Sequence, residues 1–490
     1  MTPEPAAAAL SRLSRSHRLR YALISLALLI PCFWQPRIQA GDLSSHIYNA
    51  WLAQLIESGR AGGLRIVSQT TNILFDLFLS GLFRLAGPEW AQRAAVSSAV
   101  LIFVWGAFAF ISTAAGRRAW HLIPAIAMLA YGWVFHMGFF NFYLSLGLCF
   151  WALALVWNPQ PRRVALAAAL LLLAYIAHAL PVVWTAGLIL YVWIGRRVSP
   201  RARMLLMAAS LALIVAVRLA VSRSLLYEWS LRQLTLATGA DQVWVFDGKY
   251  YFLLIGLLAI WGSLFLELIR GRSRREVVSG IPFQLSVLSA AGVFTLPTTV
   301  ALPGYNHSLV FIGERMSLGV GICVCAMLAM AQARAAQRYG LLLLASVYFL
   351  FLFQDERALN GFEDRMDEVV AQLPPGQRVV GPIIDPGLRV NALAHMVDRA
   401  CMGRCFSYAN YEPSTAQFRI RAVEVNPVVA EQYNDAWELQ TGRHVVKDHE
   451  LPLYRIDVGG EGQMAIQSLK AGVLCRSTLW EVLKNRTPSS

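Results

Sequence analysis

Long apolar blocks, separated by short polar connections, follow one another along most of the chain. Each block has the length of a helix that crosses a hydrocarbon core about 30 Å thick, which takes roughly 20 residues. A helix on the surface of a soluble protein shows a single apolar stripe instead. The pattern therefore predicts an α-class fold, a polytopic transmembrane helical bundle with about eleven spans.

The predicted spans are separated by one long connection, an outer loop over residues 36–92. Within this loop, residues 69–90 are apolar but are interrupted by Asp76 and Arg84, which favours a helix lying along the membrane surface over a further span. The spans themselves are predicted at Tyr21–Phe33, Arg93–Ala115, Trp120–Phe135, Phe140–Trp157, Val164–His178, Pro181–Gly195, Met204–Val221, Tyr251–Ile269, Phe283–Leu302, Ser317–Ala331 and Tyr339–Phe353.

Composition and charge support a membrane protein and indicate its orientation. The chain is 57% hydrophobic and only 15% charged, which excludes an ordinary set of soluble domains. The net charge of +14 comes from arginines clustered in every second connection, for example Arg162–Arg163 and Arg196–Arg197. This is the positive-inside pattern. Residues 1–20 are therefore predicted to be cytoplasmic, residues 21–353 to form the membrane domain, and no nucleic-acid partner is expected.

The tail, residues 354–490, differs in composition and is predicted to lie outside. It carries charges of both signs, and short strand-like runs alternate with Pro and Gly turns, so we expect a small extracytoplasmic α/β domain. In an oxidising compartment Cys401 and Cys405 are expected as a disulfide or as free thiols. A zinc site is disfavoured because it needs more ligands than these two and His395.

The start of the first outer loop carries the strongest candidate chemistry. Asp42, His46 and Asn49 follow the first span at a spacing that places them on one helical face. One interpretation is that Asp42 only caps the helix. The other is that a carboxylate beside an imidazole removes a proton from a sugar hydroxyl or binds a metal.

Further polar residues lie at the predicted outer ends of spans, where ionisable groups are candidates for function. Arg315 is expected to bind a lipid phosphate because a guanidinium offers a forked set of donors, and Lys249 is expected to assist it. Each of these residues also has a structural interpretation, as an interfacial or helix-capping group. The remaining candidates for the lining of a cavity are His136, Asn141, His178, Asn306, His307 and Glu314.

The residues around this loop resemble a known family. Asp42 after the first span, a helix ending Leu55-Ile-Glu-Ser-Gly59, a second helix ending Arg84-Leu-Ala-Gly-Pro-Glu-Trp90, and Arg93 opening the next span are similar to the N-terminal quarter of the GT-C glycosyltransferases. The likeness is to the bacterial branch that contains the lipid A aminoarabinose transferase. At the level of motifs it covers residues 41–115.

The resemblance implies a polyprenyl-phosphate sugar as the lipid-linked donor and a glycan, lipid or protein acceptor on the outer face. It implies that Asp42 is the catalytic carboxylate or part of a metal site, with Mg²⁺ or Mn²⁺ as candidate ions. Many members carry a second acidic residue in the next outer loop. Here that loop, residues 135–143, has none, which leaves the metal unknown. The implied location is the inner membrane of a bacterium, among membrane lipids.

Other functional classes remain open from the sequence. A transporter or lipid flippase usually has ionisable residues near the middle of the membrane or an internal repeat, and neither pattern is visible. A polysaccharide polymerase or ligase concentrates arginine and histidine in a large later loop. A non-catalytic GT-C-like scaffold is favoured by the missing second carboxylate.

Overall fold

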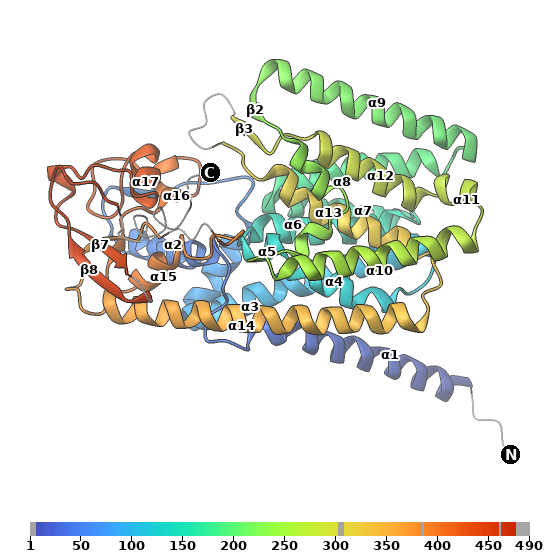
Figure 1. Ribbon diagram of the computed structural model, residues 1–490, viewed down its shortest axis with the longest axis horizontal. Coiled ribbons are helices and arrows are strands. Elements are labelled where there is room, and N and C mark those ends of the chain that lie inside the picture. The colour runs from blue at the N-terminus through green and yellow to red at the C-terminus, as the bar shows by residue number, and fades with distance from the viewer. Residues whose placement is uncertain (1–5, 302–307, 384–386, 460–461, 477–490) are drawn as a thin grey trace.

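The computed structural model describes residues 6–301, 308–383, 387–459 and 462–476, and these residues are mostly helical (Figure 1). The helices are α1 (Ala6–Leu29), α2 (Leu43–Glu57), α3 (Leu74–Ala115), α4 (Ile123–Ala130), α5 (Trp133–His136), α6 (Phe140–Val156), α7 (Pro161–Ala177), α8 (Ala179–Gly195), α9 (Pro200–Ser224), α10 (Tyr250–Gly271), α11 (Arg274–Val278), α12 (Ile281–Thr295), α13 (Ile312–Leu328), α14 (Ala335–Val370), α15 (Met396–Cys401), α16 (Tyr411–Thr415) and α17 (Tyr433–Gln440). The strands are β1 (Leu64–Ile66), β2 (Leu226–Glu228), β3 (Thr299–Ala301), β4 (Arg378–Val380), β5 (Phe406–Ser407), β6 (Ile420–Ala422), β7 (Leu453–Val458) and β8 (Met464–Ser468).

Four of the described helices, α3, α9, α10 and α14, are long and apolar enough to cross a membrane. Helices α6, α8 and α12 are apolar but shorter. Helix α9 has 25 residues, none of them buried, and exposes leucines along its length. An apolar surface of this kind is stable in lipid and not in water. The apolar helices thus indicate a membrane protein, as predicted, while the count of about eleven spans stays a prediction.

The N-terminal half of the bundle departs from the predicted span boundaries in two places. Helix α3 is kinked at Gly87 (φ 76°, ψ 175°), which Pro88 follows. Proline lacks an N–H and clashes with the preceding turn, so the predicted surface helix and the span from Arg93 form two arms of one kinked element. The range Trp120–Phe135 is not one continuous helix, because the helix is interrupted at Gly132, between α4 and α5. A Cβ there would lie 2.7 Å from the carbonyl oxygen of Gln242.

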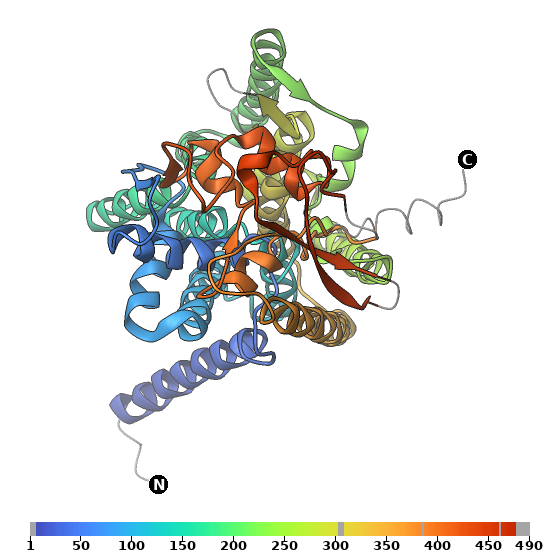
Figure 2. The same ribbon diagram turned by 90° about the vertical axis from the view of Figure 1, so that its left-hand side faces the viewer.

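The C-terminal region, which we define as residues 371–476, covers one end of the bundle (Figures 1 and 2). Helix α14 leads into it without a break at the predicted boundary after residue 353. A four-stranded sheet has the order β5-β4-β7-β8, with β4 parallel to β5 and β7, and β7 antiparallel to β8. Cys401 and Cys405 form a disulfide, whereas Cys475 is a buried free thiol.

The first outer loop and the C-terminal region form a joint structure. Strand β1 pairs antiparallel with β6, and helix α2 packs against α15. A buried ion pair joins the C-terminal region to α14, since Arg399 donates from Nε and Nη2 to the two oxygens of Glu363 at 2.6 and 2.8 Å. The same guanidinium donates to Gln92 of α3 at 3.0 Å and to the carbonyl of Ile38 at 3.3 Å. Residues more than 300 positions apart are thereby fixed relative to one another.

A cluster of arginines marks the end of the bundle that lies away from the C-terminal region. Helix α11 and the start of α1 lie at the end opposite the C-terminal region (Figure 1). The arginine cluster of residues 270–275 is therefore at that far end, away from the first outer loop.

Candidate functional site

The backbone at Asp42 is held by the turn that precedes α6. The amide of Gly41 donates to the carbonyl of His136 at 2.7 Å, and the amide of Asp42 donates to that of Met137 at 3.0 Å. Gly138 has φ 83°, and a Cβ there would lie 2.5 Å from the nitrogen of Asp42. Only glycine permits this approach. The first residue of the candidate site is thus fixed against the bundle by its backbone.

The side chain of Asp42 is not used as a helix cap. Asp42 occupies the N-cap position of α2, but its carboxylate accepts no capping hydrogen bond. Its nearest charged partner is His395, whose Nε2 lies 3.7 Å from Oδ1 of Asp42. The Asp42 side chain is 24% exposed, more than that of His395, His46 or Glu412. Asp42 therefore presents an uncapped, accessible carboxylate.

His395 is held by a chain of polar groups in the C-terminal region. Its Nδ1 lies 3.2 Å from Oδ2 of Asp398, and the hydroxyl of Ser407 donates to Oδ1 of Asp398 at 2.5 Å. The ring of Tyr411 packs against the imidazole, with centroids 5.4 Å apart. The bond to Asp398 fixes the ring so that Nε2 points to Asp42.

His46 belongs to a second buried group beside the first. Its Nδ1 lies 2.6 Å from Oδ1 of Asp76, and Nδ2 of Asn141 donates to Oδ2 of Asp76 at 2.7 Å. Glu412 approaches the same imidazole, at 4.0 Å. His46 and Asn141, both predicted from the sequence, thus meet at Asp76. The imidazole that touches Asp42 belongs to His395 and not to His46.

Burial and neighbouring charges shift the titration of these groups. Burial and then the charge of Asp76 raise the pKa of Glu412 to about 7. Burial alone lowers the pKa of His46, but the charge and hydrogen bond of Asp76, with Glu412 and Asp42, outweigh it and raise the pKa to about 9. Burial also lowers the pKa of His395. The hydrogen bond to Asp398 and the charges of Asp398 and Asp42 outweigh burial, so the pKa of His395 is raised.

Glu412→Gln is expected to stabilise the protein at alkaline pH. A carboxyl group whose pKa rises on folding, here from 4.5 to about 7, contributes stability below pH 4.5 that is lost as pH rises through 7. Glutamine does not titrate, so the variant should match wild type at pH 5 and exceed it at pH 8, by on the order of 2 kcal/mol. The measurement is the apparent melting temperature in detergent against pH.

The exposed Glu424 offers the matched control for this experiment, since Glu424→Gln should leave the pH dependence unchanged. The titration of His46 has the same sign, because its contribution to stability is present below pH 6.5 and lost as pH rises through about 9. Part of the loss of stability at alkaline pH should therefore persist in Glu412→Gln. Equal pH dependence in the variant and wild type would contradict the assignment.

Arg315 adds positive charge to the surroundings of Asp42. Its guanidinium stacks on the ring of Phe139 at 3.7 Å, and among the described residues no carboxylate lies within ion-pair distance of it. Its Nε is buried without a hydrogen-bond partner in the described part of the chain. Asp42, Tyr411 and Glu314 are the ionisable groups whose charge acts on it. An arginine with donors to spare is suited to an anionic ligand.

The structure does not bring the other predicted residues to Asp42 as free groups. Lys249 pairs with Asp247 at 3.3 Å and with Asp355, so its charge is already neutralised. His136 is fully buried, and its Nε2 lies 3.3 Å from Glu356.

The remaining predicted residues have varied surroundings. His178 caps α8, where its Nδ1 accepts from the amide of Leu180. Glu314 has one oxygen, Oε2, that is buried without a partner in the described ranges. Asn306 and His307 lie outside the described residues.

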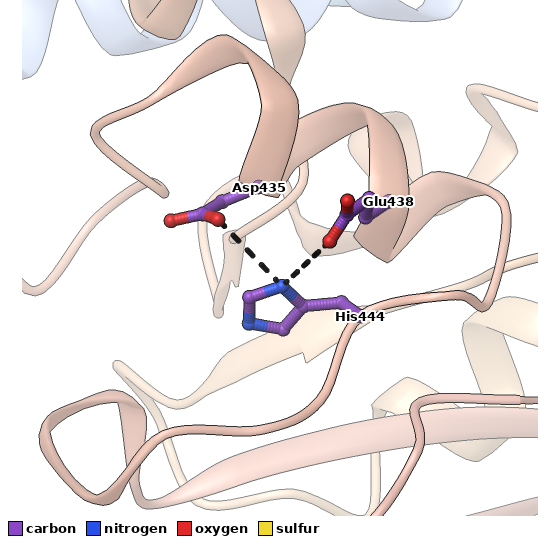
Figure 3. A group of neighbouring side chains, drawn as sticks. All are labelled: Asp435, Glu438 and His444. Carbon is purple, nitrogen blue, oxygen red and sulfur yellow. Dashed lines mark ion pairs between the residues drawn. The ribbon is translucent and has the colours of Figure 1, made fainter.

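One group of side chains converges as metal ligands do, and it lies away from Asp42. Asp435, Glu438 and His444 of the C-terminal region offer ligand atoms within 4.8 Å of one another (Figure 3). Lys447 pairs with Asp435 at 2.7 Å, and Glu450 lies 2.9 Å from Nε2 of His444. The group is thus balanced by its own ion pairs.

Asp42 itself belongs to no set of three converging His, Cys, Asp or Glu ligands in the part of the chain that the structure describes. In the described residues, Asp42 is thus not part of a three-ligand metal site built from these side chains.

The C-terminal region supplies candidate-site residues that the sequence did not place near Asp42, namely His395, Asp398, Tyr411 and Glu412. Their spacing gave a weak signal: His395 and Asp398 are three apart, which places them on one helical face. No pattern along the chain connects them to Asp42, more than 350 residues earlier.

Comparison with known proteins gives no family for this chain. No family model matches it, and neither a curated protein nor a solved structure is similar enough to be identified as a relative.

Proposed function

We propose that this protein is a membrane glycosyltransferase of the GT-C type, which transfers a sugar from a polyprenyl phosphate to an acceptor at the outer face of a bacterial inner membrane. The observation that carries the proposal is an uncapped, accessible carboxylate, Asp42, whose charge acts on an arginine, Arg315, that has no carboxylate partner among the described residues. A carboxylate and a spare guanidinium together suit a reaction in which a hydroxyl loses a proton while a phosphate leaves.

The position of this group agrees with the proposed orientation. The arginine cluster of residues 270–275 lies at the end of the bundle opposite the C-terminal region, where a positive-inside protein has its cytoplasmic side. Asp42 is then at the outer side, where a lipid-linked donor is used. A transporter is less well supported, because its ionisable residues are expected near the middle of the membrane.

The proposed mechanism uses residues of this chain alone. The donor phosphate binds Arg315, whose spare N–H donors face it. Asp42 accepts the proton of the acceptor hydroxyl as its oxygen attacks the anomeric carbon. The new carbon–oxygen bond forms while the bond to the phosphate oxygen breaks, and the electron pair leaves with the phosphate, where Arg315 stabilises the charge. No step requires a metal ion.

The test uses the purified full-length protein in lipid nanodiscs with a panel of radiolabelled polyprenyl-phosphate sugars. Release of polyprenyl phosphate is measured with bacterial envelope extract as the source of acceptor, and without it. Turnover of at least one donor supports the proposal. A protein that binds donors without turnover is a scaffold, and one that moves them across the bilayer is a flippase; either result overturns the proposal.

Arg315→Met is expected to weaken binding of a short-chain polyprenyl phosphate about tenfold or more, because hydrogen bonds to charged groups contribute roughly 1.5–3 kcal/mol. The dissociation constant is measured in nanodiscs of neutral lipid. Arg315→Lys keeps the charge but loses the fork, and an intermediate affinity is expected. Arg223→Met, an exposed arginine at the end of α9, is the control for general attraction of anions. Unchanged affinity in Arg315→Met would remove this residue from the site.

A further inference from the structure

We propose that His395, which the C-terminal region supplies, is the positioning residue for Asp42, orienting its carboxylate and supplying the positive charge that a metal ion would otherwise bring. The inference rests on the proposed function and extends it, because it assigns part of the reaction centre to a segment more than 350 residues from Asp42 in sequence.

The first argument is geometric. Three groups connect the C-terminal region to Asp42 through successive contacts: the Ser407 hydroxyl, the Asp398 carboxylate and the His395 imidazole. The last contact is between Nε2 of His395 and Oδ1 of Asp42, at 3.7 Å. The hydrogen bond from Ser407 fixes the Asp398 carboxylate, and Asp398 fixes the imidazole, as a buried carboxylate does in a catalytic triad.

The second argument is electrostatic. The charged and titratable groups that face Asp42 come from three parts of the fold: His46 of α2, Arg315 of α13, and His395, Tyr411 and Glu412 of the C-terminal region. Among the described lysines, arginines and histidines, His395 is the one that lies within 4.0 Å of the Asp42 carboxylate. The His395 imidazole lies between two carboxylates, Asp42 at 3.7 Å and Asp398 at 3.2 Å, and its positive charge attracts both.

The third argument concerns the cation that Asp42 would otherwise need. A carboxylate that is to accept a proton must remain ionised, and a divalent ion is one way to keep it so. Among the described residues Asp42 has no second and third ligand that converge on such an ion. His395 and Arg315 already bring positive charge to this position. The protein's own cations therefore take the place of the metal.

His46 does not have this role, although it is on the same helix as Asp42. Its Nδ1 is bonded to Asp76 at 2.6 Å, and Asp76 is held in turn by Asn141. The hydrogen bonds of Asp76 thus go to His46 and Asn141. His46 contributes charge to the surroundings of Asp42, whereas His395 contacts the Asp42 carboxylate.

The first experiment tests the pairing without any substrate. Asp42→Asn, His395→Asn and the double variant are compared with wild type by apparent melting temperature, with the full chain in detergent at pH 6. If the two side chains interact favourably, the double variant loses the interaction once and is destabilised less than the sum of the single variants. The control pair combines Asp42→Asn with His449→Asn, an exposed histidine of the same region, and should be additive.

The second experiment measures the consequence for the reaction with the donor that the panel identifies. His395→Asn is expected to lower kcat about tenfold or more and to change KM less than about threefold, because His395 acts on the base and not on the donor. Asp398→Asn should lower kcat by a smaller factor, because it removes only the group that holds the His395 imidazole. Wild-type activity should persist after treatment with EDTA.

The outcomes separate the inference from the proposed function. If no donor is turned over but the melting temperatures of Asp42→Asn and His395→Asn are non-additive, the proposed function fails and the pairing remains. If Asp42 is required for turnover but His395→Asn keeps the wild-type kcat and is additive with Asp42→Asn, His395 is not the positioning residue. Loss of activity in EDTA, restored by Mg²⁺ or Mn²⁺, would overturn the replacement of the metal.

Discussion

Asp42→Asn is expected to lower sugar transfer by roughly 10²–10⁴-fold, because asparagine cannot accept the proton of the attacking hydroxyl. The protein should still insert and accumulate normally. The Asp42 carboxylate makes no capping bond, and the backbone amide, not the side chain, holds the residue against Met137. Binding of the polyprenyl phosphate should also remain, since Arg315 is unchanged. The measurements are the transfer rate, the abundance in membranes and the dissociation constant.

Two variants make this experiment specific. Asp42→Glu keeps a base on a longer side chain and should retain part of the activity, which asparagine should not. Asp448→Asn, at an exposed position of the C-terminal region, controls for the loss of a negative charge in general. A fully active Asp42→Asn protein would exclude Asp42 as the catalytic base.

The largest effect on stability is expected for Arg399→Met, at about 3–5 kcal/mol, because it leaves the charge of Glu363 buried without its main partner. The Glu363 carboxylate is fully buried and would keep only the amide of Gln39, at 2.8 Å, and the more distant Arg37, at 3.8 Å. The variant should show a strongly reduced apparent melting temperature in detergent. Proteolysis should release the C-terminal region from the bundle, since Arg399 also donates to Gln92.

A second substitution at Glu363 distinguishes a lost ion pair from a lost side chain. The double variant Arg399→Met with Glu363→Gln contains no buried unpaired charge and should recover part of the stability. Arg357→Met removes an exposed arginine of the same helix, α14, and should be close to neutral. If Arg399→Met is as stable as Arg357→Met, the buried pair is not what joins the two segments.

The apolar pattern predicted much of the helical content, with errors where packing overrides it. The predicted spans Met204–Val221 and Tyr251–Ile269 fall within α9 and α10. In both, a long apolar block is bounded by charged residues, which the sequence shows directly. The range Trp120–Phe135 was predicted as one helix, but Gly132 packs against Gln242 and the helix ends before it. That contact is between distant segments and has no local signature.

The sequence predicted only part of the candidate site, because contacts between distant segments have no local signature. Asp42 and His46 stand out because charged residues are unusual beside an apolar span. Lys249 was chosen on the same grounds, yet the fold pairs it with Asp355. The partner of Asp42 was expected to be His46, four residues away on the helix. The structure instead places His395 at Asp42, because the C-terminal region folds onto the first outer loop.

The sequence by itself determined what depends on local composition: the apolar character that indicates a membrane protein, the arginine-rich connections, and an isolated carboxylate at the start of the first outer loop. These properties follow from neighbouring residues, since a hydrophobic block or a charge is visible without its contacts. Only the tertiary structure decided which imidazole meets Asp42, which arginine is left without a carboxylate, and how Arg399 joins segments more than 300 residues apart. Such pairings depend on burial and distance in three dimensions, which no spacing along this chain encodes.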